Sequence, residues 1–454
     1  MPIREPAVLR PARRHDRKRR IPDPSNPYRD PASFLDFHLK PNHGESRNPL
    51  FFNWIRKLST SARKARQPLI EPGSPSQPSF PIEYIDTAAD LARLVKAMGP
   101  VETVYLDLEA DSMHHYFAKI CLIQILVGEV CYLVDPLSEE IRLDAFLARL
   151  SEKVLVLHGA DYDLRMLYQQ HGFRPFRVYD TMLAAQLLGK PGFGLAALVQ
   201  AYFGVALQKD QQKADWSQRP LPHLMLQYGA QDTFFLPGLH QALTEELEAK
   251  GRLEWHAESC RELVKATAKS KEIDLENTWR IDGSSKLYPR QLAVLQALWK
   301  FRDRVAQEAD LPTYRILPSD ILLRFSMAVP PEGEPAQIPS LPSRLNPKTR
   351  AGFLETFYQA LNLPASAWPQ PLKPPRRTAP SPSAALLADL KEIRDRIAAD
   401  LKMDPSLLAT KSTLNAVALT GCTSKSRMIA AAKWMQWQED LLLEAWLKPE
   451  KRKD

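Results

Sequence analysis

Residues 103–109 read TVYLDLE, and this stretch determines the fold that we expect for the centre of the chain. Apolar residues at 104, 106 and 108 alternate with a tyrosine, Asp107 and Glu109, which is the period of a β-strand. In a strand, both carboxylates lie on one face and repel each other. The pattern therefore favours a bound hard cation such as Mg²⁺ or Mn²⁺, which prefers oxygen ligands. A solvated strand face is the alternative interpretation.

The flanking segments extend this strand into an α/β domain. EYIDTAADLARLVKAM at 83–98 reads as a strand and then a helix. CLIQILV at 121–127 and CYLVD at 131–135 continue an antiparallel run, and further helices and strands such as VLVLHG at 154–159 alternate after it. We therefore expect residues 81–255 to form a domain with a mixed sheet and helices on both of its faces.

Two later fragments place further polar side chains on helices. Tyr228 and Asp232 are four residues apart in YGAQDTFFL, which reads as helix, so they share a face. Asp163 follows VLHGADY near the start of a helix that Gly172 is suited to end. Each fragment alone has an ordinary explanation, because aromatic and acidic residues often share helix surfaces and the helix dipole favours an acid in the first turn.

The conjunction of these fragments resembles the DEDD exonuclease superfamily in its tyrosine-bearing branch, most closely the ribonuclease D family. The resemblance lies in LDLEADSMHHYFAKICLIQI at 106–125, VLHGADYDLRMLYQQHG at 156–172 and DWSQRPLPHLMLQYGAQDTFFL at 215–236. It implies a ribonuclease H-like fold for the domain. It also implies two divalent cations, Mg²⁺ or Mn²⁺, and a set of catalytic residues in which the acids bind metal: Asp107, Glu109, Asp163, Asp232 and Tyr228.

The same resemblance implies a 3′–5′ exoribonuclease that releases 5′-mononucleotides. Tyr228 would orient the attacking water, because a phenol with a pKa near ~10 is a poor base near neutrality. The expected substrates are the 3′ ends of tRNA precursors or other small structured RNAs. Two alternatives stay open, namely a DNA 3′–5′ exonuclease with the same metal site and a catalytically silent RNA-binding scaffold.

Other polar residues lie close to these motifs. We expect Asp180 to cap a helix that starts at Thr181, Asp215 to support the DWS turn and Asp111 to be exposed. Asp161 precedes Asp163 by two residues, and the family pattern counted from the preceding histidine selects Asp163. His114, in the loop after the metal strand, is a candidate substrate contact, with a solvated loop histidine as the alternative.

Length and composition restrict the class of protein. A chain of 454 residues is expected to hold two to four domains. No apolar run approaches the roughly 18–20 residues that span a bilayer, and the basic, proline-rich start lacks the apolar core of a secretion signal. The four cysteines lack metal-site spacing and indicate free thiols. We therefore expect a cytoplasmic protein without a membrane segment, and a monomer.

Charge divides the chain into three parts. Residues 1–80 hold 16 Lys/Arg against 7 Asp/Glu, residues 81–339 hold 27 against 35, and residues 340–454 hold 18 against 11. Basic flanks around an acidic body suit nucleic acid bound through its phosphates, although they also suit solubility. We expect residues 1–80 to be a mostly disordered arm, with a short amphipathic helix at 51–66.

The remainder of the chain is helical in pattern. FRDRVAQEADLPTYRILPSDIL at 301–322 resembles an HRDC domain, which we expect at 285–365. A proline-rich linker at 366–383 precedes a second HRDC-like module at 384–447, where LKEIRDRIAADLKMDPSLLATK echoes the first. The expected role of both modules is to hold RNA. Four basic residues of the second module are candidate phosphate contacts, with a solvated charged face as the alternative for each: Lys411, Lys425, Arg427 and Lys433. We expect Trp434, Trp437 and Trp446 to belong to the core rather than to stack on bases.

Overall fold

The computed structural model describes residues 81–447, with interruptions at 208–209, 270–273, 275, 334, 336 and 373–380. The expected arm at 1–80, including the helix expected at 51–66, lies outside the described residues.

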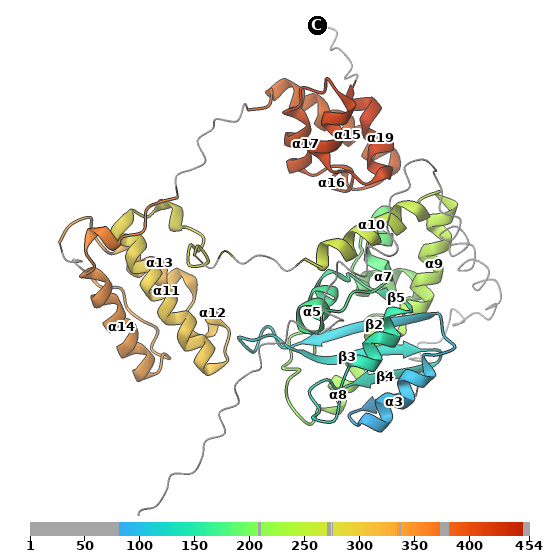
Figure 1. The fold of residues 1–454 in the computed structure, drawn as a ribbon, viewed down its shortest axis with the longest axis horizontal. Coiled ribbons are helices and arrows are strands. Elements are labelled where there is room, and N and C mark those ends of the chain that lie inside the picture. Colours follow the sequence, from blue (N-terminus) through green and yellow to red (C-terminus); the bar gives the residue numbers. More distant parts are fainter. Residues whose placement is uncertain are drawn as a thin grey trace, which may run out of the picture. The chain divides into compact units, whose positions relative to one another are not determined.

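A six-stranded mixed sheet forms the centre of the first domain (Figure 1). The middle of the sheet is antiparallel, because β3 pairs in that sense with both β2 and β4. The remaining neighbours, β1 with β4, β2 with β5 and β5 with β6, are parallel. The spatial order is β1-β4-β3-β2-β5-β6, and the strands are β1 (Ile82–Ile85), β2 (Thr103–Ala110), β3 (Ile120–Val127), β4 (Val130–Val134), β5 (Val154–Leu157) and β6 (Arg177–Asp180).

Helices cover both faces of the sheet (Figure 1), as the sequence predicts. On one face, Val104, Leu106 and Leu108 of β2 join a core with helices α3 (Ala88–Ala97), α4 (Asp144–Ser151) and α5 (Asp161–His171). On the other face, α8 (His223–Phe234) packs across the middle strands β2, β3 and β4. The remaining helices of the domain are α6 (Thr181–Leu187), α7 (Leu195–Phe203), α9 (Leu236–Ala249) and α10 (Leu253–Thr267).

A helical region with its own core follows. Its elements are the short η2 (Ser284–Lys286), α11 (Pro289–Ala309), α12 (Thr313–Ile316), α13 (Ser319–Met327), α14 (Pro347–Leu361) and the short η3 (Ala365–Ala367). Phe325 of α13 lies between Phe353 and Phe357 of α14, with ring centroids 4.9 and 5.3 Å away in edge-to-face contacts. Leu292, Leu295 and Leu298 of α11 are buried in this core.

A second helical region comprises α15 (Ala384–Leu401), α16 (Pro405–Leu408), α17 (Lys411–Ala418), α18 (Lys425–Ala432) and α19 (Gln436–Leu447). Trp437 and Trp446 are buried in an apolar core, and Trp434 is partly buried against that core, which confirms their expected structural role. The four candidate phosphate contacts at 411, 425, 427 and 433 are all exposed.

The two helical regions repeat a backbone pattern. The first helix of each ends at a non-glycine residue in the left-handed conformation, Asp310 with φ 47° and Lys402 with φ 53°. A four-residue helix follows in both cases and ends at an extended residue, Leu317 or Ala409. The next helix then begins within two residues.

One arginine supports this pattern in each region, and it is buried in the first region and partly buried in the second. Arg302 Nη1 donates to the carbonyl oxygen of Leu317 at 3.1 Å, and Arg394 Nη1 donates to that of Ala409 at 2.8 Å. Each arginine therefore satisfies the carbonyl of the extended residue that ends the short helix. The shared geometry supports the prediction that residues 384–447 form a second module of the same type.

All four cysteines are free thiols, and all four are buried. Among the described residues, no helix combines the length and the apolar character that crossing a membrane requires.

Candidate active site

Strand β2 presents Asp107 and Glu109 on the face that α8 covers. The alternation that the sequence predicts is present, because residues 104, 106 and 108 are buried in the opposite direction. In the antiparallel ladder, Asp107 pairs with Gln124 of β3 and Glu109 pairs with Leu122. The register then shifts between Glu109 and Ala110, so the strand irregularity lies directly beside the acidic pair.

Helix α8 brings Asp232 and Tyr228 to the same face. Gly229 and Ala230 lie between them on the buried side of the helix. A Cβ atom at position 229 would come within 3.2 Å of both Gln124 Nε2 and Leu122 Cδ2, so the glycine lets α8 approach β3 closely. This approach allows an acid from a distant part of the sequence to join the acids of β2.

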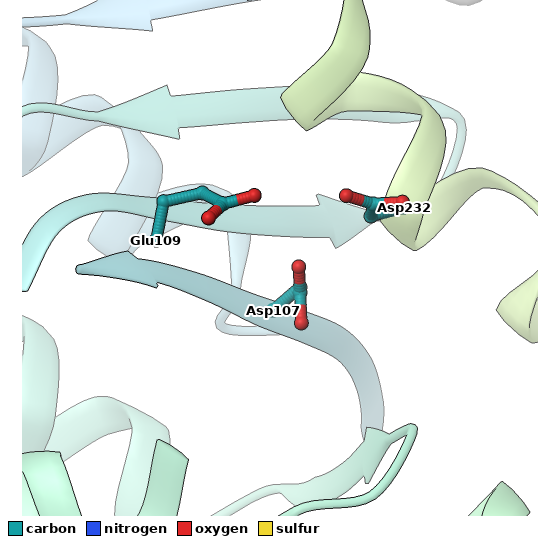
Figure 2. A group of neighbouring side chains, drawn as sticks. All are labelled: Asp107, Glu109 and Asp232. Carbon is teal, nitrogen blue, oxygen red and sulfur yellow. The ribbon is translucent and has the colours of Figure 1, made fainter. Parts of the chain in front are cut away.

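The three carboxylates of Asp107, Glu109 and Asp232 converge (Figure 2). One oxygen from each lies within 4.8 Å of the other two. The side chains extend from β2 and from α8 into one shared space between these elements (Figure 2). Oxygen ligands from three acids at this spacing suit a hard divalent cation.

The electrostatics of the cluster also fit a cation. Burial raises the pKa of Asp107 to about 7. Burial, together with the charges of Asp107, Asp232 and Asp163, raises the pKa of Glu109 to about 10. Burial, followed by the charge of Asp107, also raises the pKa of Asp232 well above its ordinary value. Among the described residues, no basic side chain contributes to the shifted pKa values of these three acids, so a divalent ion is the natural counter-charge.

Asp163 lies at the edge of this cluster. It is buried in the first turn of α5, which ends at Gly172 in the left-handed conformation as the sequence predicts. Burial, then the charges of Asp107 and Asp180, raise the pKa of Asp163 well above the ordinary range. Asp163 is thus close enough to Asp107 to interact electrostatically, but it is not one of the three acids within 4.8 Å.

Tyr228 is a half-buried phenol close enough to the acids to interact with their charges. Burial, followed by the charges of Asp232, Glu109 and Asp107, raises its pKa above the ordinary value. The hydroxyl therefore keeps its proton and is available as a hydrogen-bond donor. The indole of Trp216 lies beside it, with ring centroids 6.1 Å apart.

Neighbouring acids have separate structural roles. The Asp180 carboxylate accepts from the backbone N–H groups of Gly159 and Ala160 at 2.9 Å, and from that of Met182 at 2.8 Å. It therefore caps α6, as predicted, and also holds the start of α5. Asp161 forms an exposed ion pair with Arg165, at 2.8 and 2.9 Å.

One prediction for the loop after β2 is wrong. Asp111, expected to be exposed, is fully buried, and its carboxylate accepts from the backbone N–H of Lys119 at 2.6 Å. The backbone carbonyl of Asp111 also accepts from the N–H groups of His114 and His115, so the loop folds around this residue. His114 is half-buried, with Nε2 3.0 Å from the carbonyl oxygen of Lys213, and its contact with substrate stays a prediction.

Two features of the site were not found by motif reasoning. Arg219 forms a two-pronged pair with Asp135, the residue directly after β4, at 2.6 Å for both contacts, and Tyr84 donates to the same carboxylate at 2.6 Å. This pair holds the segment before α8 against the sheet. The other feature is Gln124, the one polar residue in the eight buried residues of β3. A polar residue inside an otherwise apolar strand is the signal that identifies it.

Comparisons with known proteins agree with this geometry. The model of a 3′–5′ exonuclease family matches residues 82–248, and the HRDC domain model matches residues 291–334. Ribonuclease D of Gluconacetobacter diazotrophicus is 30% identical over 340 residues, which covers 74% of this chain and 86% of that protein.

Solved structures give the same result. The crystal structure of Escherichia coli RNase D, an exoribonuclease involved in structured RNA processing, matches with a TM-score of 0.58 and 26% identity, covering 80% of this chain and 97% of the other. The catalytic core of RRP6 from Trypanosoma brucei matches with a TM-score of 0.54 and 25% identity, covering 70% and 89%. With its exonuclease and HRDC regions in this order, the chain belongs to the ribonuclease D family of 3′–5′ exoribonucleases.

Proposed function

We propose that this protein trims the 3′ ends of small structured RNAs, including tRNA precursors, by hydrolysis that depends on two divalent cations, Mg²⁺ or Mn²⁺. The observation that supports the site most directly is the convergence of Asp107, Glu109 and Asp232 within 4.8 Å. Asp163, buried at the start of α5 and coupled electrostatically to Asp107, is the proposed fourth ligand.

The donor set fits the proposed metals, since every proposed ligand is a carboxylate and hard divalent cations prefer oxygen. When bound, such cations lower the pKa of a water and stabilise negative charge on phosphoryl oxygens. Asp107 and Glu109 would hold their positions because both residues pair with β3, while the start of β2 at 103–105 is also paired with β5. Asp232 is held by the packing of α8 on β3.

Tyr228 has the proposed role of orienting the attacking water. The ordinary pKa of a phenol, near ~10, makes the hydroxyl poorly suited to remove a proton near neutrality, whereas it can donate a hydrogen bond. This supports water orientation over general-base catalysis. The products proposed for this reaction are 5′-mononucleotides released from a free 3′ end.

RNA is the proposed substrate because the similar Escherichia coli protein is an exoribonuclease that processes structured RNA. The basic 340–454 region, with its exposed Lys411 and Arg427, is the proposed surface for phosphate contacts. A catalytically silent scaffold is disfavoured because no proposed acidic ligand is replaced. We also propose that the protein is cytoplasmic and acts as a monomer.

The test uses a structured RNA with a single-stranded 3′ tail, labelled at its 3′ end, and a DNA strand of the same sequence. The wild-type protein should release labelled mononucleotide from RNA only when Mg²⁺ or Mn²⁺ is added. Asp107→Asn should abolish release. Asp161→Asn is the matched control, because Asp161 is also acidic but is exposed and paired with Arg165. A clear preference for DNA, or RNA binding without release, would overturn the proposal.

A further inference from the structure

Gln124 is a buried polar residue without a hydrogen-bond partner. The eight residues of β3 are all buried, and Gln124 has no exposed surface. Within the described part of the chain, neither its Nε2 nor its Oε1 atom has a hydrogen-bond partner. Buried side-chain amides in proteins are normally hydrogen-bonded, because removal from water without a partner is unfavourable. An unpartnered amide in this position therefore indicates a role that packing alone does not explain.

The position of Gln124 connects it to the metal site. Gln124 is the direct cross-strand partner of Asp107 in the antiparallel ladder, and such partners have their side chains on the same face. That face is covered by α8, on which Gly229 lies between Tyr228 and Asp232. A Cβ atom at position 229 would lie 3.2 Å from Gln124 Nε2 and 3.5 Å from Gln124 Cγ. The amide thus lies beside β2, which carries Asp107, and beneath α8, which carries Asp232.

The hydrogen-bond donors of the Gln124 amide complement the carboxylate acceptors of the acid cluster. A glutamine amide offers two N–H donors, and an ionised carboxylate is an acceptor only. The acids of the cluster offer many acceptor sites, and no basic side chain in the described part of the chain contributes to their pKa values. Ligands of a metal ion are commonly held in orientation by an outer hydrogen bond of this kind.

We propose that Gln124 is a positioning residue for the metal site, whose Nε2–H group donates to the carboxylate of Asp107 in the metal-bound enzyme and fixes the orientation of that ligand. This inference rests on the proposed metal-dependent function. Gln124 does not itself bind the metal or the RNA. It acts through Asp107, and Gly229 leaves the space in which the amide lies.

The competing explanation is that Gln124 only fills space beneath α8. Two substitutions on the same face of β3 distinguish the explanations. Gln124→Leu removes the amide but keeps a side chain of similar size. Leu126→Ala, two residues along the strand, removes packing and leaves the amide in place, since Leu126 is buried in the cluster beneath α8.

The experiment measures the Tm of the full chain during a titration with Mn²⁺, and in parallel the release of mononucleotide from RNA. A ligand that binds the folded state raises Tm, so the titration reports metal binding without reference to activity. For Gln124→Leu we expect an unchanged or higher Tm without metal, because an unpartnered buried amide is replaced by an apolar group. We expect its Mn²⁺ midpoint to rise by about 10–100-fold, the usual effect of losing an outer partner of a ligand.

Leu126→Ala should give the opposite result, a lower Tm without metal and an unchanged Mn²⁺ midpoint. The inference is overturned if Gln124→Leu keeps the wild-type midpoint, or if its midpoint rises only together with a loss of metal-free Tm such as Leu126→Ala shows. If wild-type protein shows no response of Tm to Mn²⁺, the proposed metal site itself fails, so the two failures are distinguishable.

Discussion

Asp107 on β2 and Asp232 on α8 are far apart in sequence, yet one carboxylate oxygen of each lies within 4.8 Å of the other. Two ionised acids at this separation in a half-buried site repel each other strongly. Whenever both groups are ionised, the fold therefore holds an unfavourable interaction at one point between β2 and α8. Binding of a divalent cation would convert this repulsion into attraction.

Replacing Asp232 by a neutral residue should lower the rate of RNA hydrolysis without lowering the Tm of the metal-free protein. We expect Asp232→Asn to lower the rate of RNA hydrolysis by at least ~100-fold, because a ligand of the metal is lost. Its Tm without metal should be equal to or above that of wild type, because the amide does not repel Asp107. Thermal unfolding in EDTA and in Mg²⁺ measures both effects. A variant with normal hydrolysis would remove Asp232 from the site.

The metal-free protein should lose stability as pH rises. The folded-state pKa is about 7 for Asp107 and about 10 for Glu109, and both lie above the ordinary carboxyl value of ~4 that holds in the unfolded chain. Each group therefore makes its full contribution to the free energy of unfolding below pH ~4, where it is protonated in both states. The contribution of Asp107 is lost as pH rises toward about 7, and that of Glu109 as pH rises toward about 10. In EDTA, Tm should fall continuously from pH ~5 to pH ~9.

Added Mg²⁺ should reverse this trend, because protons and cations compete for the same oxygens. The increase in Tm caused by Mg²⁺ should be larger at pH ~8 than at pH ~6. Glu109→Gln is the matched control, since it keeps the shape of the side chain and cannot ionise. Its Tm in EDTA should depend less on pH than that of wild type. Identical pH profiles for the two proteins would contradict the assignment.

The sequence predicted the parts of this site that depend on local periodicity. Alternation in TVYLDLE placed Asp107 and Glu109 on one face, and helical spacing placed Tyr228 and Asp232 together. The burial of Asp111 could not be predicted in this way, because it depends on a loop that folds back through Lys119. Long-range pairs, such as that of Arg219 with Asp135, leave no periodic signal either.

The role of Asp180 is larger than the cap that its sequence position predicts. Its carboxylate accepts hydrogen bonds from the backbone at the start of both α5 and α6, and α5 carries Asp163. We expect Asp180→Ala to lower the free energy of unfolding by about 2–4 kcal/mol, since two helix starts lose their acceptor. Urea unfolding measures the loss. Asp161→Ala, which removes only an exposed ion pair at the same helix, should change it little.

The pair formed by Arg219 and Asp135 should stabilise the position of α8. Asp135 is buried, and although burial raises its pKa, hydrogen bonds from Arg219 and Tyr84 lower it below the ordinary value. Replacing the arginine leaves this carboxylate charged without its partner. We expect Arg219→Leu to lower the free energy of unfolding by about 3 kcal/mol, because breaking one side of a buried pair leaves an uncompensated charge.

A double variant identifies the origin of the stability that Arg219→Leu is expected to lose. Arg219→Leu combined with Asp135→Asn removes both charges, so it should be more stable than Arg219→Leu alone, even though it carries one more substitution. Urea unfolding of the four proteins gives the coupling between the two sites. If the losses in the free energy of unfolding of the two single variants simply add in the double variant, the ion pair does not hold the segment before α8. In that case the packing of Trp216, which is almost fully buried in the same segment, must hold it.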